Sequence, residues 1–181
     1  MSIMHLAGSL TEAGLRAAFA REAENHTRYL LFSEKAKEAG YEQISRLFRE
    51  TADNEKAHAR LLFEALHSSL PAVGEALSLS SESEYADGNE FYPSLARDAR
   101  NEGFPAVAAL YEKLAAVEKE HEARFRALLR NVEGGLVFAK TGEAIWQCGN
   151  CGHVHVGKSA PETCPVCSYP QGYFALRAAN Y

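Results

Sequence analysis

Two short stretches of the chain could hold a metal, because each places a carboxylate three residues before an imidazole. They are Glu55-x-x-His58 and Glu118-x-x-His121, and both lie in helical sequence patterns. Residues three apart share a face of a helix, so each stretch directs its two ligands at one point. Two such pairs are half of the carboxylate-bridged two-metal site of a four-helix bundle, which takes one further Glu from each of the other two helices.

The surroundings of these two stretches also match. A shift of 63 positions, from Glu55 to Glu118, needs no gap and aligns Gly40 with Gly103, Tyr41 with Phe104, Ile44 with Val107, Phe48 with Tyr111, and Ala52 with Ala115. A single Glu-x-x-His on a charged helix is common by chance, but here each pair interrupts an apolar stripe. A carboxylate in such a position must be paired, protonated or bound to a cation, which favours a metal site.

Two further carboxylates occupy core positions in other helical patterns. Glu22 lies on the apolar stripe of the first helix. Glu84 lies on the face of the third, and Asp87 follows it three residues later on the same face. Glu22 and Glu84 are therefore the carboxylates expected from helices one and three. His26 lies on the same stripe, where it has either a metal or proton role or, as the commoner outcome, a contact with the backbone.

Helix start and stop signals place these ligands on four long helices. Ser9 with Glu12 fits a capping box, and Gly103 and Pro105 end one helix and open the next. Pro93 predicts a local kink. The predicted helices cover residues 10–39, 41–68, 82–102 and 105–131, and the serine-rich segment 68–83 is predicted to be a connection.

The last part of the chain predicts short strands, at residues 137–139, 145–147, 154–156 and 173–176. It also holds every cysteine, in two Cys-x-x-Cys pairs: Cys148, Cys151, Cys164 and Cys167. Two such knuckles bind one tetrahedral zinc or iron through four thiolates, and their spacing does not choose between the two metals. A disulfide scaffold is the less favoured alternative. A segment this short is expected to depend on its metal to fold.

Length and composition set the frame for these sites. The 181 residues are 46% hydrophobic and 24% charged, which suits one well-filled domain and a small appendage. With a net charge of -5 and no basic cluster, we expect no nucleic-acid partner. The N-terminus lacks the pattern of a signal peptide, and no apolar run is long enough to span a membrane. We therefore expect a cytoplasmic protein.

The whole chain resembles the rubrerythrin family. The runs that carry this resemblance are Ala18–Glu22 with Tyr29 downstream, Glu50–Glu55 leading to His58, Phe91-Tyr92-Pro93, Ala116–Glu118 leading to His121, and Trp146–Gly152. The resemblance implies an all-α four-helix bundle of ferritin-like type at residues 1–135, followed by a small β-rich, rubredoxin-like metal-knuckle domain at residues 136–181. It also implies a di-iron centre in the bundle and one Fe(Cys)4 site in the tail.

Carried over residue by residue, the resemblance makes Glu55 and Glu118 bridging carboxylates. Glu22 is then a ligand of one iron, and Glu84 with His121 of the other. The family pattern makes His58 the mobile ligand, which a glutamate of helix three replaces on oxidation. This sequence has Asp87 at that position, one methylene shorter, and Glu90 is the alternative ligand there. Tyr29 and Tyr92 are expected to hydrogen-bond ligand carboxylates or the bound oxygen species, or else to be core aromatics.

The function implied by the resemblance is the reduction of hydrogen peroxide to water by a non-haem di-iron peroxidase, in oxidative-stress defence. Its expected partners are an electron-donor protein, such as a rubredoxin or its reductase, and a second copy of the chain in a head-to-tail homodimer. One alternative is a ferroxidase or iron-handling protein that uses oxygen. Another is a metal-binding or interaction module whose tail holds zinc. His58 and the cysteine-rich tail favour the peroxidase over the ferroxidase.

Overall fold

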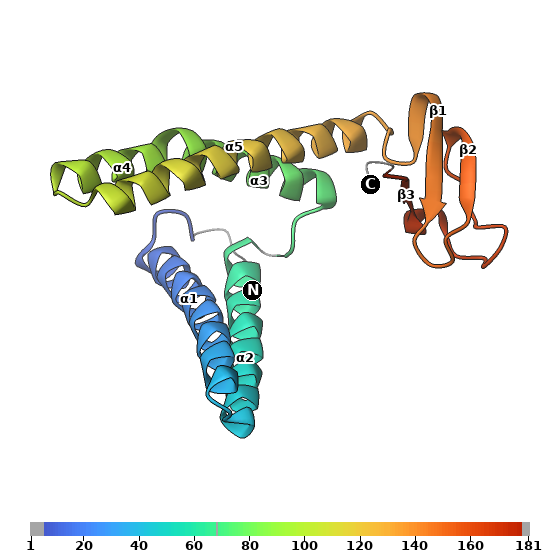
Figure 1. Cartoon of the computed structure of the whole chain (residues 1–181). Helices are drawn as coiled ribbons and strands as arrows, with labels where there is room; N and C mark the ends of the chain where they lie inside the picture. Colours follow the sequence, from blue (N-terminus) through green and yellow to red (C-terminus); the bar gives the residue numbers. More distant parts are fainter. Residues whose placement is uncertain (1–5, 68, 179–181) are drawn as a thin grey trace. The chain divides into compact units, whose positions relative to one another are not determined.

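The computed structural model describes residues 6–67 and 69–178, and the chain divides into two compact units between Pro71 and Ala72. The first unit is a helical hairpin of α1 (Leu10–Glu38) and α2 (Glu42–His67), which lie side by side (Figure 1). At the start of α1, Ser9 accepts a hydrogen bond from the Glu12 backbone N–H at 3.1 Å. The predicted N-cap is therefore confirmed.

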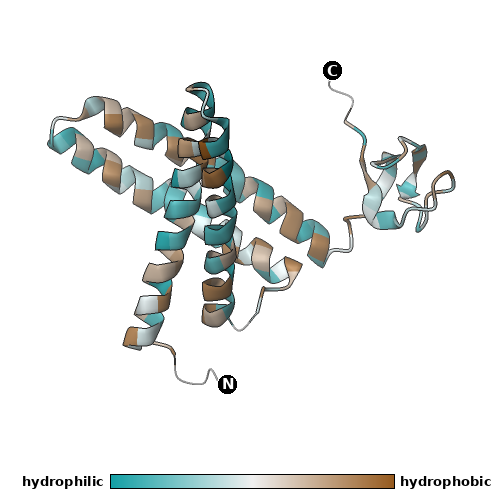
Figure 2. Ribbon diagram, turned by 90° about the horizontal axis from the view of Figure 1, so that it is seen from below, coloured by the Kyte–Doolittle hydropathy of each residue, from teal (hydrophilic) through white to brown (hydrophobic). Residues whose placement is uncertain are grey.

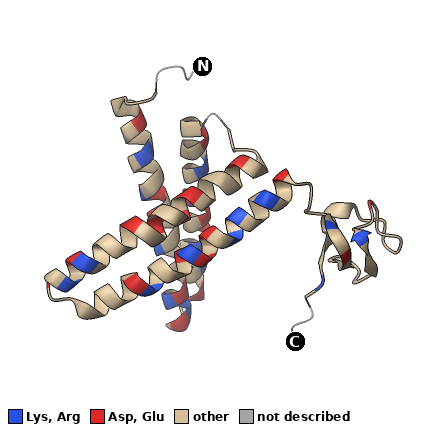
Figure 3. Ribbon diagram, turned by 90° about the horizontal axis from the view of Figure 1, so that it is seen from above, with Lys and Arg blue, Asp and Glu red and all other residues tan. Residues whose placement is uncertain are grey.

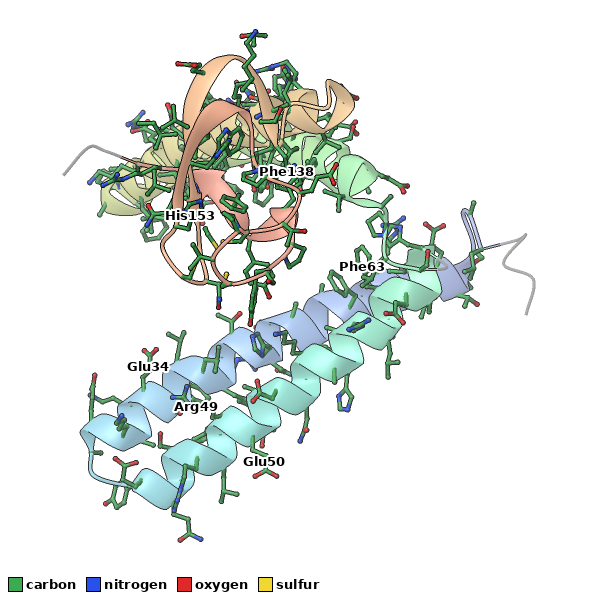
Figure 4. The ribbon with its side chains drawn as sticks, turned by 90° about the vertical axis from the view of Figure 1, so that its right-hand side faces the viewer. Glu34, Arg49, Glu50, Phe63, Phe138 and His153 are labelled. Carbon is green, nitrogen blue, oxygen red and sulfur yellow. The ribbon has the colours of Figure 1, made fainter. Side chains whose placement is uncertain are left out.

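Small residues fill the interface between α1 and α2. Its buried members are Ser33, Ser45, Ala52 and Ala59. The Ser33 hydroxyl donates to the Ser45 backbone carbonyl at 2.9 Å, so the closest approach of the helices is hydrogen-bonded. Larger rings also pack between the two helices: the ring of Phe63, labelled in Figure 4, lies 5.8 Å from that of Phe19 between centroids.

The second unit contains a second hairpin and the tail. Its helices are α3 (Val73–Ala86), the π-helical turn η1 (Asp87–Phe91), α4 (Tyr92–Asn101) and α5 (Pro105–Glu133), and α5 lies along the other three (Figure 1). Hydrophobic residues recur along all the long helices (Figure 2), and residues of both charges are interspersed on them (Figure 3). Pairs four residues apart, such as Arg60–Glu64 and Glu122–Arg126, bridge successive turns.

The third helix begins earlier than the sequence predicts. We expected a connection at residues 68–83, but α3 starts at Val73, so most of the serine-rich segment is helical. Its hydroxyls do not compete with the helix, because Ser81 donates to the Ser78 carbonyl at 2.9 Å and Ser78 donates to Glu82 at 3.2 Å. The connection shrinks to residues 68–72, of which residue 68 lies outside the described residues.

The irregularity of the third helix also differs from the expected kink at Pro93. The helix widens into η1 just before that residue, and Pro93 itself lies in the first turn of α4. Gly88 lies buried in this turn. A Cβ added there would lie 3.1 Å from the Ala115 carbonyl oxygen and 3.0 Å from Lys119 Cγ, so η1 packs directly on the α5 backbone.

The tail is a three-stranded antiparallel sheet with the order β2-β1-β3. Its strands are β1 (Ala139–Cys148), β2 (Val154–Ser159) and β3 (Phe174–Leu176). β1 contains the predicted strand at 145–147, but only Ala139 of the predicted strand at 137–139, and its register against β2 is irregular between Ala139 and Ala144. The core of the tail consists of Trp146, Cys148, Ala160, Cys164 and Phe174.

A mostly helical region followed by a small strand region confirms the predicted fold class. The predicted boundary between bundle and tail at residues 135/136 stays a prediction. The turn at Gly134-Gly135 ends α5 just before it, where Gly135 adopts a φ of 65°.

Candidate metal centres

The first hairpin brings Glu22, Glu55 and His58 together, one from α1 and two from α2. One ligand atom of each lies within 4.8 Å of the others. His58 Nδ1 lies 3.0 Å from a Glu55 carboxylate oxygen and 3.7 Å from one of Glu22. The i, i+3 spacing thus aims both α2 ligands at one point, as the sequence predicted. We call these three residues the first trio.

The carboxylates of the first trio lie too close to be charged independently. The pKa of Glu22 is raised, first by its hydrogen bond with Glu55 and then by loss of hydration, while the same hydrogen bond lowers the pKa of Glu55. The negative charges of the two carboxylates therefore repel each other, and a divalent cation placed among them would remove the repulsion.

The second hairpin brings together Glu84 from α3 with Glu118 and His121 from α5, which we call the second trio. Their ligand atoms also lie within 4.8 Å of one another. His121 Nδ1 is 2.7 Å from a Glu118 oxygen and 3.5 Å from one of Glu84. Burial, and then the hydrogen bond and negative charge of Glu118, raise the pKa of Glu84. The two trios are alike in donor type and spacing, and in each of them one carboxylate has a raised pKa.

Asp87 does not join the second trio. It begins η1, and its backbone carbonyl accepts the hydrogen bond from the Tyr92 N–H. Glu90 is exposed, which fits a surface position. The cluster of Glu84, Glu118 and His121 does not include Asp87. Replacement of His58 by Asp87 on oxidation therefore stays a prediction.

The two candidate tyrosines have different surroundings. Burial raises the pKa of the Tyr92 hydroxyl, and the charges of Glu118, Asp87 and Glu84 raise it further, so this hydroxyl lies within electrostatic reach of the second trio. Tyr29 packs among aromatic rings, 6.4 Å from Phe32 and 6.2 Å from Phe48 between centroids. These ring contacts agree with the alternative prediction that Tyr29 is a core aromatic residue.

One residue near the first trio makes the contact expected from its pattern. His26 Nδ1 lies 2.8 Å from the Ala52 backbone carbonyl oxygen, so it ties α1 to α2. Its ring belongs to the hairpin interface, and the trio is formed without it.

The four cysteines of the tail converge as the knuckle pattern predicts. Their sulfurs lie within 4.8 Å of one another, with 3.8 Å between Cys148 and Cys167 and 3.6 Å between Cys151 and Cys164. A tetrahedral site with metal–sulfur bonds of about 2.3 Å has edges of about 3.8 Å, so the four thiols fit one metal. All four cysteines are free, which argues against the disulfide scaffold.

Each knuckle closes with the same backbone hydrogen bond. The N–H of Gly152 donates to the Cys148 carbonyl, and the N–H of Ser168 donates to the Cys164 carbonyl, both at 2.9 Å. Gly152 and Ser168 adopt positive φ angles of 78° and 59°. The tight turn after each pair holds its two sulfurs on one side.

The thiols differ in proton affinity. A hydrogen bond from the Asn150 side chain and another from the Tyr169 N–H lower the pKa of Cys167 to about 6. The His153 N–H lowers the pKa of Cys151, but loss of hydration and the neighbouring sulfurs outweigh it and raise that pKa to about 12. Four sulfurs this close together are suited to a cation at their centre, so the set fits a bound metal.

Comparisons with known proteins agree with this geometry. The rubrerythrin family model matches residues 14–73 and 75–147, and the model of the rubrerythrin rubredoxin-like domain matches residues 146–175. The rubrerythrin of Porphyromonas gingivalis is 43% identical over 96% of this chain and 93% of its own length. This chain belongs to the rubrerythrin family.

Other relatives span the chain equally well. The rubrerythrin of Nitratidesulfovibrio vulgaris is 39% identical over 97% of this chain and 98% of its own length. The solved structure of fully reduced nigerythrin is 27% identical over 94% of this chain and 91% of its own, with a TM-score of 0.37. The assignment to the rubrerythrin family therefore rests on the sequence matches.

Membership in the rubrerythrin family confirms the predicted cofactor sites: di-iron ligand clusters of Glu and His in the helices and a four-cysteine rubredoxin-like site in the tail. The donors fit these metals, because carboxylate and imidazole ligands suit iron and four thiolates suit an iron–sulfur site. Within the described residues, no helix is long and apolar enough to cross a membrane.

Proposed function

We propose that this rubrerythrin-family protein is a di-iron peroxidase that reduces hydrogen peroxide to water with electrons delivered through its Fe(Cys)4 tail. The observation that carries the proposal is the pairing of two matched Glu-Glu-His trios with a complete four-cysteine site in one chain. Neither trio alone offers enough ligands for two metals. Together they supply four carboxylates and two imidazoles, whose charge nearly balances that of two ferrous ions.

In this proposal each ligand has a distinct task. Glu55 and Glu118 would be the carboxylates shared by both metals, as the resemblance implies; each lies closer to the histidine of its own trio than the other carboxylate does and is the less exposed of the two. Glu22 and Glu84 each bind one metal. When bound, the two irons supply the two electrons that cleave the O–O bond of hydrogen peroxide.

Peroxide reduction also consumes two protons for each pair of water molecules formed. Tyr92 keeps its proton because burial and the nearby carboxylates raise its pKa. Its hydroxyl is thus a suitable hydrogen-bond donor to an oxygen atom at the second trio.

Electron delivery assigns a role to the tail. A site with four thiolates around one iron changes charge by one unit and holds its geometry, which suits single-electron transfer. We propose a soluble electron-donor protein of the rubredoxin class as the source, and a homodimer in which the tail of one copy serves the helices of the other. Cysteines remain available as metal ligands, and do not form disulfides, in a reducing compartment. The four free cysteines therefore support a cytoplasmic location.

A ferroxidase is the main rival function, since it uses the same carboxylates with oxygen as the oxidant. The imidazole of His58, which is 57% exposed beside Glu22 and Glu55, supports the peroxidase, because the resemblance makes it the mobile ligand. The four-cysteine tail supports it as well, since a ferroxidase takes its electrons from the iron that it oxidises.

The proposal is tested with the purified, chemically reduced protein. Hydrogen peroxide and oxygen are added in separate stopped-flow experiments, and the red absorbance of the oxidised Fe(Cys)4 site reports electron loss from the tail. We expect peroxide to oxidise the tail at least about tenfold faster than oxygen does. Faster oxidation by oxygen would favour the ferroxidase, and a colourless tail that holds zinc would exclude electron relay.

A further inference from the structure

A groove runs along the second hairpin, where η1 and α4 lie against α5. Its volume is about 360 Å³, which is enough for a small organic ligand. Each helix contributes residues at the spacing i, i+3, i+4 and i+7, which forms one stripe along a helix. The stripe of α4 runs from Pro93 to Arg100, and that of α5 runs from Glu112 to Lys119. The groove therefore lies between two stripes of equal length.

Small residues form the floor of this groove. Ala96 of α4 and Ala115 of α5 are buried there, with 3% and 7% of their surfaces exposed. Gly88 of η1 also lines the groove. Because none of these residues has a side chain beyond Cβ, the space above them stays open.

The internal repeat shows what fills the same place in the first hairpin. A shift of 62 positions, which relates the α1 metal ligand to that of α3, also relates His26 to Gly88. The contacts agree, because His26 Nδ1 lies 2.8 Å from the Ala52 carbonyl oxygen, and a Cβ on Gly88 would lie 3.1 Å from that of Ala115. Ala52 and Ala115 are themselves aligned by the repeat. An imidazole thus occupies in the first hairpin the place that Gly88 leaves open in the second.

The walls of the groove carry an excess of positive charge. Three cations, Arg97, Arg100 and Lys119, accompany one carboxylate, Glu112, so the lining has a formal charge of +2 in a chain whose net charge is -5. Arg100 pairs with Glu112 at 2.7 Å. Within the part of the chain that the structure describes, Arg97 and Lys119 have no ion-pair partner. Their charges are therefore available to a ligand.

We propose that this groove binds an organic phosphate monoester, with its phosphate group at Arg97 and Lys119 and its apolar body on the floor. A surplus of two positive charges balances a dianion. The planar fork of an arginine and the ammonium of a lysine are donors that suit phosphate oxygens. An apolar body would also cover Ala96 and Ala116, and so bury apolar surface that inorganic phosphate leaves in water.

The groove is separate from the metal ligands of the second hairpin. Lys119 and Glu118 are adjacent on α5, so their side chains point about 100° apart around the helix. None of the residues that line the groove belongs to a trio, and the inference does not rest on the proposed function. A bound ligand would join α4 to α5 beside η1, and the backbone there would open less often.

Calorimetric titration of the iron-loaded protein tests the site, at low ionic strength and in a buffer free of phosphate. Phenyl phosphate is the probe, because it joins a dianion to an apolar ring. Inorganic phosphate supplies the charge alone, and benzoate supplies the ring with a single charge. We expect one site per chain for phenyl phosphate, with an affinity at least about tenfold higher than for the other two compounds. Equal affinities, or no saturable binding of phenyl phosphate, would overturn the proposal.

Ala116 allows a matched pair of variants, because it is exposed and the repeat aligns it with Asp53 of the first hairpin. Ala116→Asp adds a carboxylate to the groove and should weaken the binding of phenyl phosphate at least about tenfold. Ala116→Asn has nearly the same shape and should keep the affinity within about threefold. Equal effects of the two substitutions, or unchanged binding by Ala116→Asp, would place the ligand elsewhere and overturn the proposal.

A second pair of variants separates a specific contact from general attraction by charge. Arg97→Ala removes a wall of the groove and should weaken binding at least about tenfold. Arg46→Ala makes the same change of net charge on α2 and should have little effect. Both residues are exposed, so both variants are expected to fold, which circular dichroism checks. Equal losses in the two variants would overturn the proposal.

Hydrogen exchange locates the ligand independently of affinity. Phenyl phosphate should slow the exchange of backbone amides in residues 87–101, which form η1 and α4, and should leave the first hairpin unchanged. Exchange that stays the same in residues 87–101 at a saturating concentration of phenyl phosphate would overturn the proposal.

Discussion

The two helical hairpins present the same three ligands but differ in how they place them. In the first hairpin, α1 and α2 are uninterrupted helices that meet through Ser33 and Ser45. In the second, the third helix is interrupted by η1 and meets α5 through Gly88, whose missing side chain lets two backbones touch. The ligand sets match, although the packing that supports them does not.

The difference between the hairpins indicates what the π-helical turn contributes. A π turn inserts one residue without ending a helix, so every later side chain is rotated by about 100° relative to its earlier course. In this protein Tyr92 directly follows that turn and lies within electrostatic reach of the second trio. The first hairpin has no such turn, and Tyr29 packs with Phe32 and Phe48. The two hairpins thus have the same types of metal ligand, but only the tyrosine of the second hairpin, Tyr92, is influenced by the charges of its trio.

The largest effects are expected from the ligands in which the hairpins agree. Glu55→Ala and Glu118→Ala should each lower kcat/KM for peroxide by more than about 100-fold. Loss of a residue that only supports a metal ligand typically costs about 10- to 100-fold, and loss of the ligand itself should cost more. Helix content should persist in both, measured by circular dichroism. Glu24→Ala, at an exposed position of α1, is the control and should retain wild-type turnover. Losses that differ strongly between the two variants would show that the trios are not equivalent.

The next largest effect concerns the tyrosines. Tyr92→Phe should lower kcat by about 100-fold, because it removes a proton donor beside the second trio. Tyr29→Phe should change kcat by less than about threefold, since the ring contacts of Tyr29 do not need its hydroxyl. Steady-state peroxide assays with equal iron loading measure both. A similar loss in the two variants would contradict the asymmetry of the hairpins.

A smaller effect is expected from the packing of η1. Gly88→Val should lower the free energy of unfolding by about 1–3 kcal/mol, because its side chain meets the Ala115 carbonyl and Lys119. The matched control is Gly74→Ala in α3, where an added Cβ meets nothing within 4 Å. This control should be neutral or stabilising by up to about 1 kcal/mol. Urea unfolding measures the stability, and faster hydrogen exchange in the second hairpin alone locates the change.

The smallest effect is expected in the interior of the first hairpin. Ser33→Ala removes the hydrogen bond to the Ser45 carbonyl and should cost about 1 kcal/mol of unfolding free energy. Thr27→Ala is the control, because its exposed hydroxyl bonds only within its own helix, and it should change stability by less than about 0.5 kcal/mol. If urea unfolding finds equal effects, the buried serine pair does not hold the helices together.

The amino-acid sequence by itself determined the metal chemistry of this protein. Glu55 and His58 converge because a helix places residues three apart on one face, and the two Cys-x-x-Cys pairs converge because each forms a tight knuckle. These are local rules that need no knowledge of distant parts of the chain. The same rules predicted α1, α2 and α5 to within a few residues at each end.

Only the tertiary structure decided where α3 begins and how it is shaped. Serine-rich sequence favours connections, yet residues 73–83 are helical because they pack along α5 and satisfy their hydroxyls within the helix. Pro93 was expected to bend the helix, whereas the irregularity forms at η1, where Gly88 meets the α5 backbone. Both outcomes depend on contacts with a helix some thirty residues away, and local propensity is a weak guide wherever such packing competes with it.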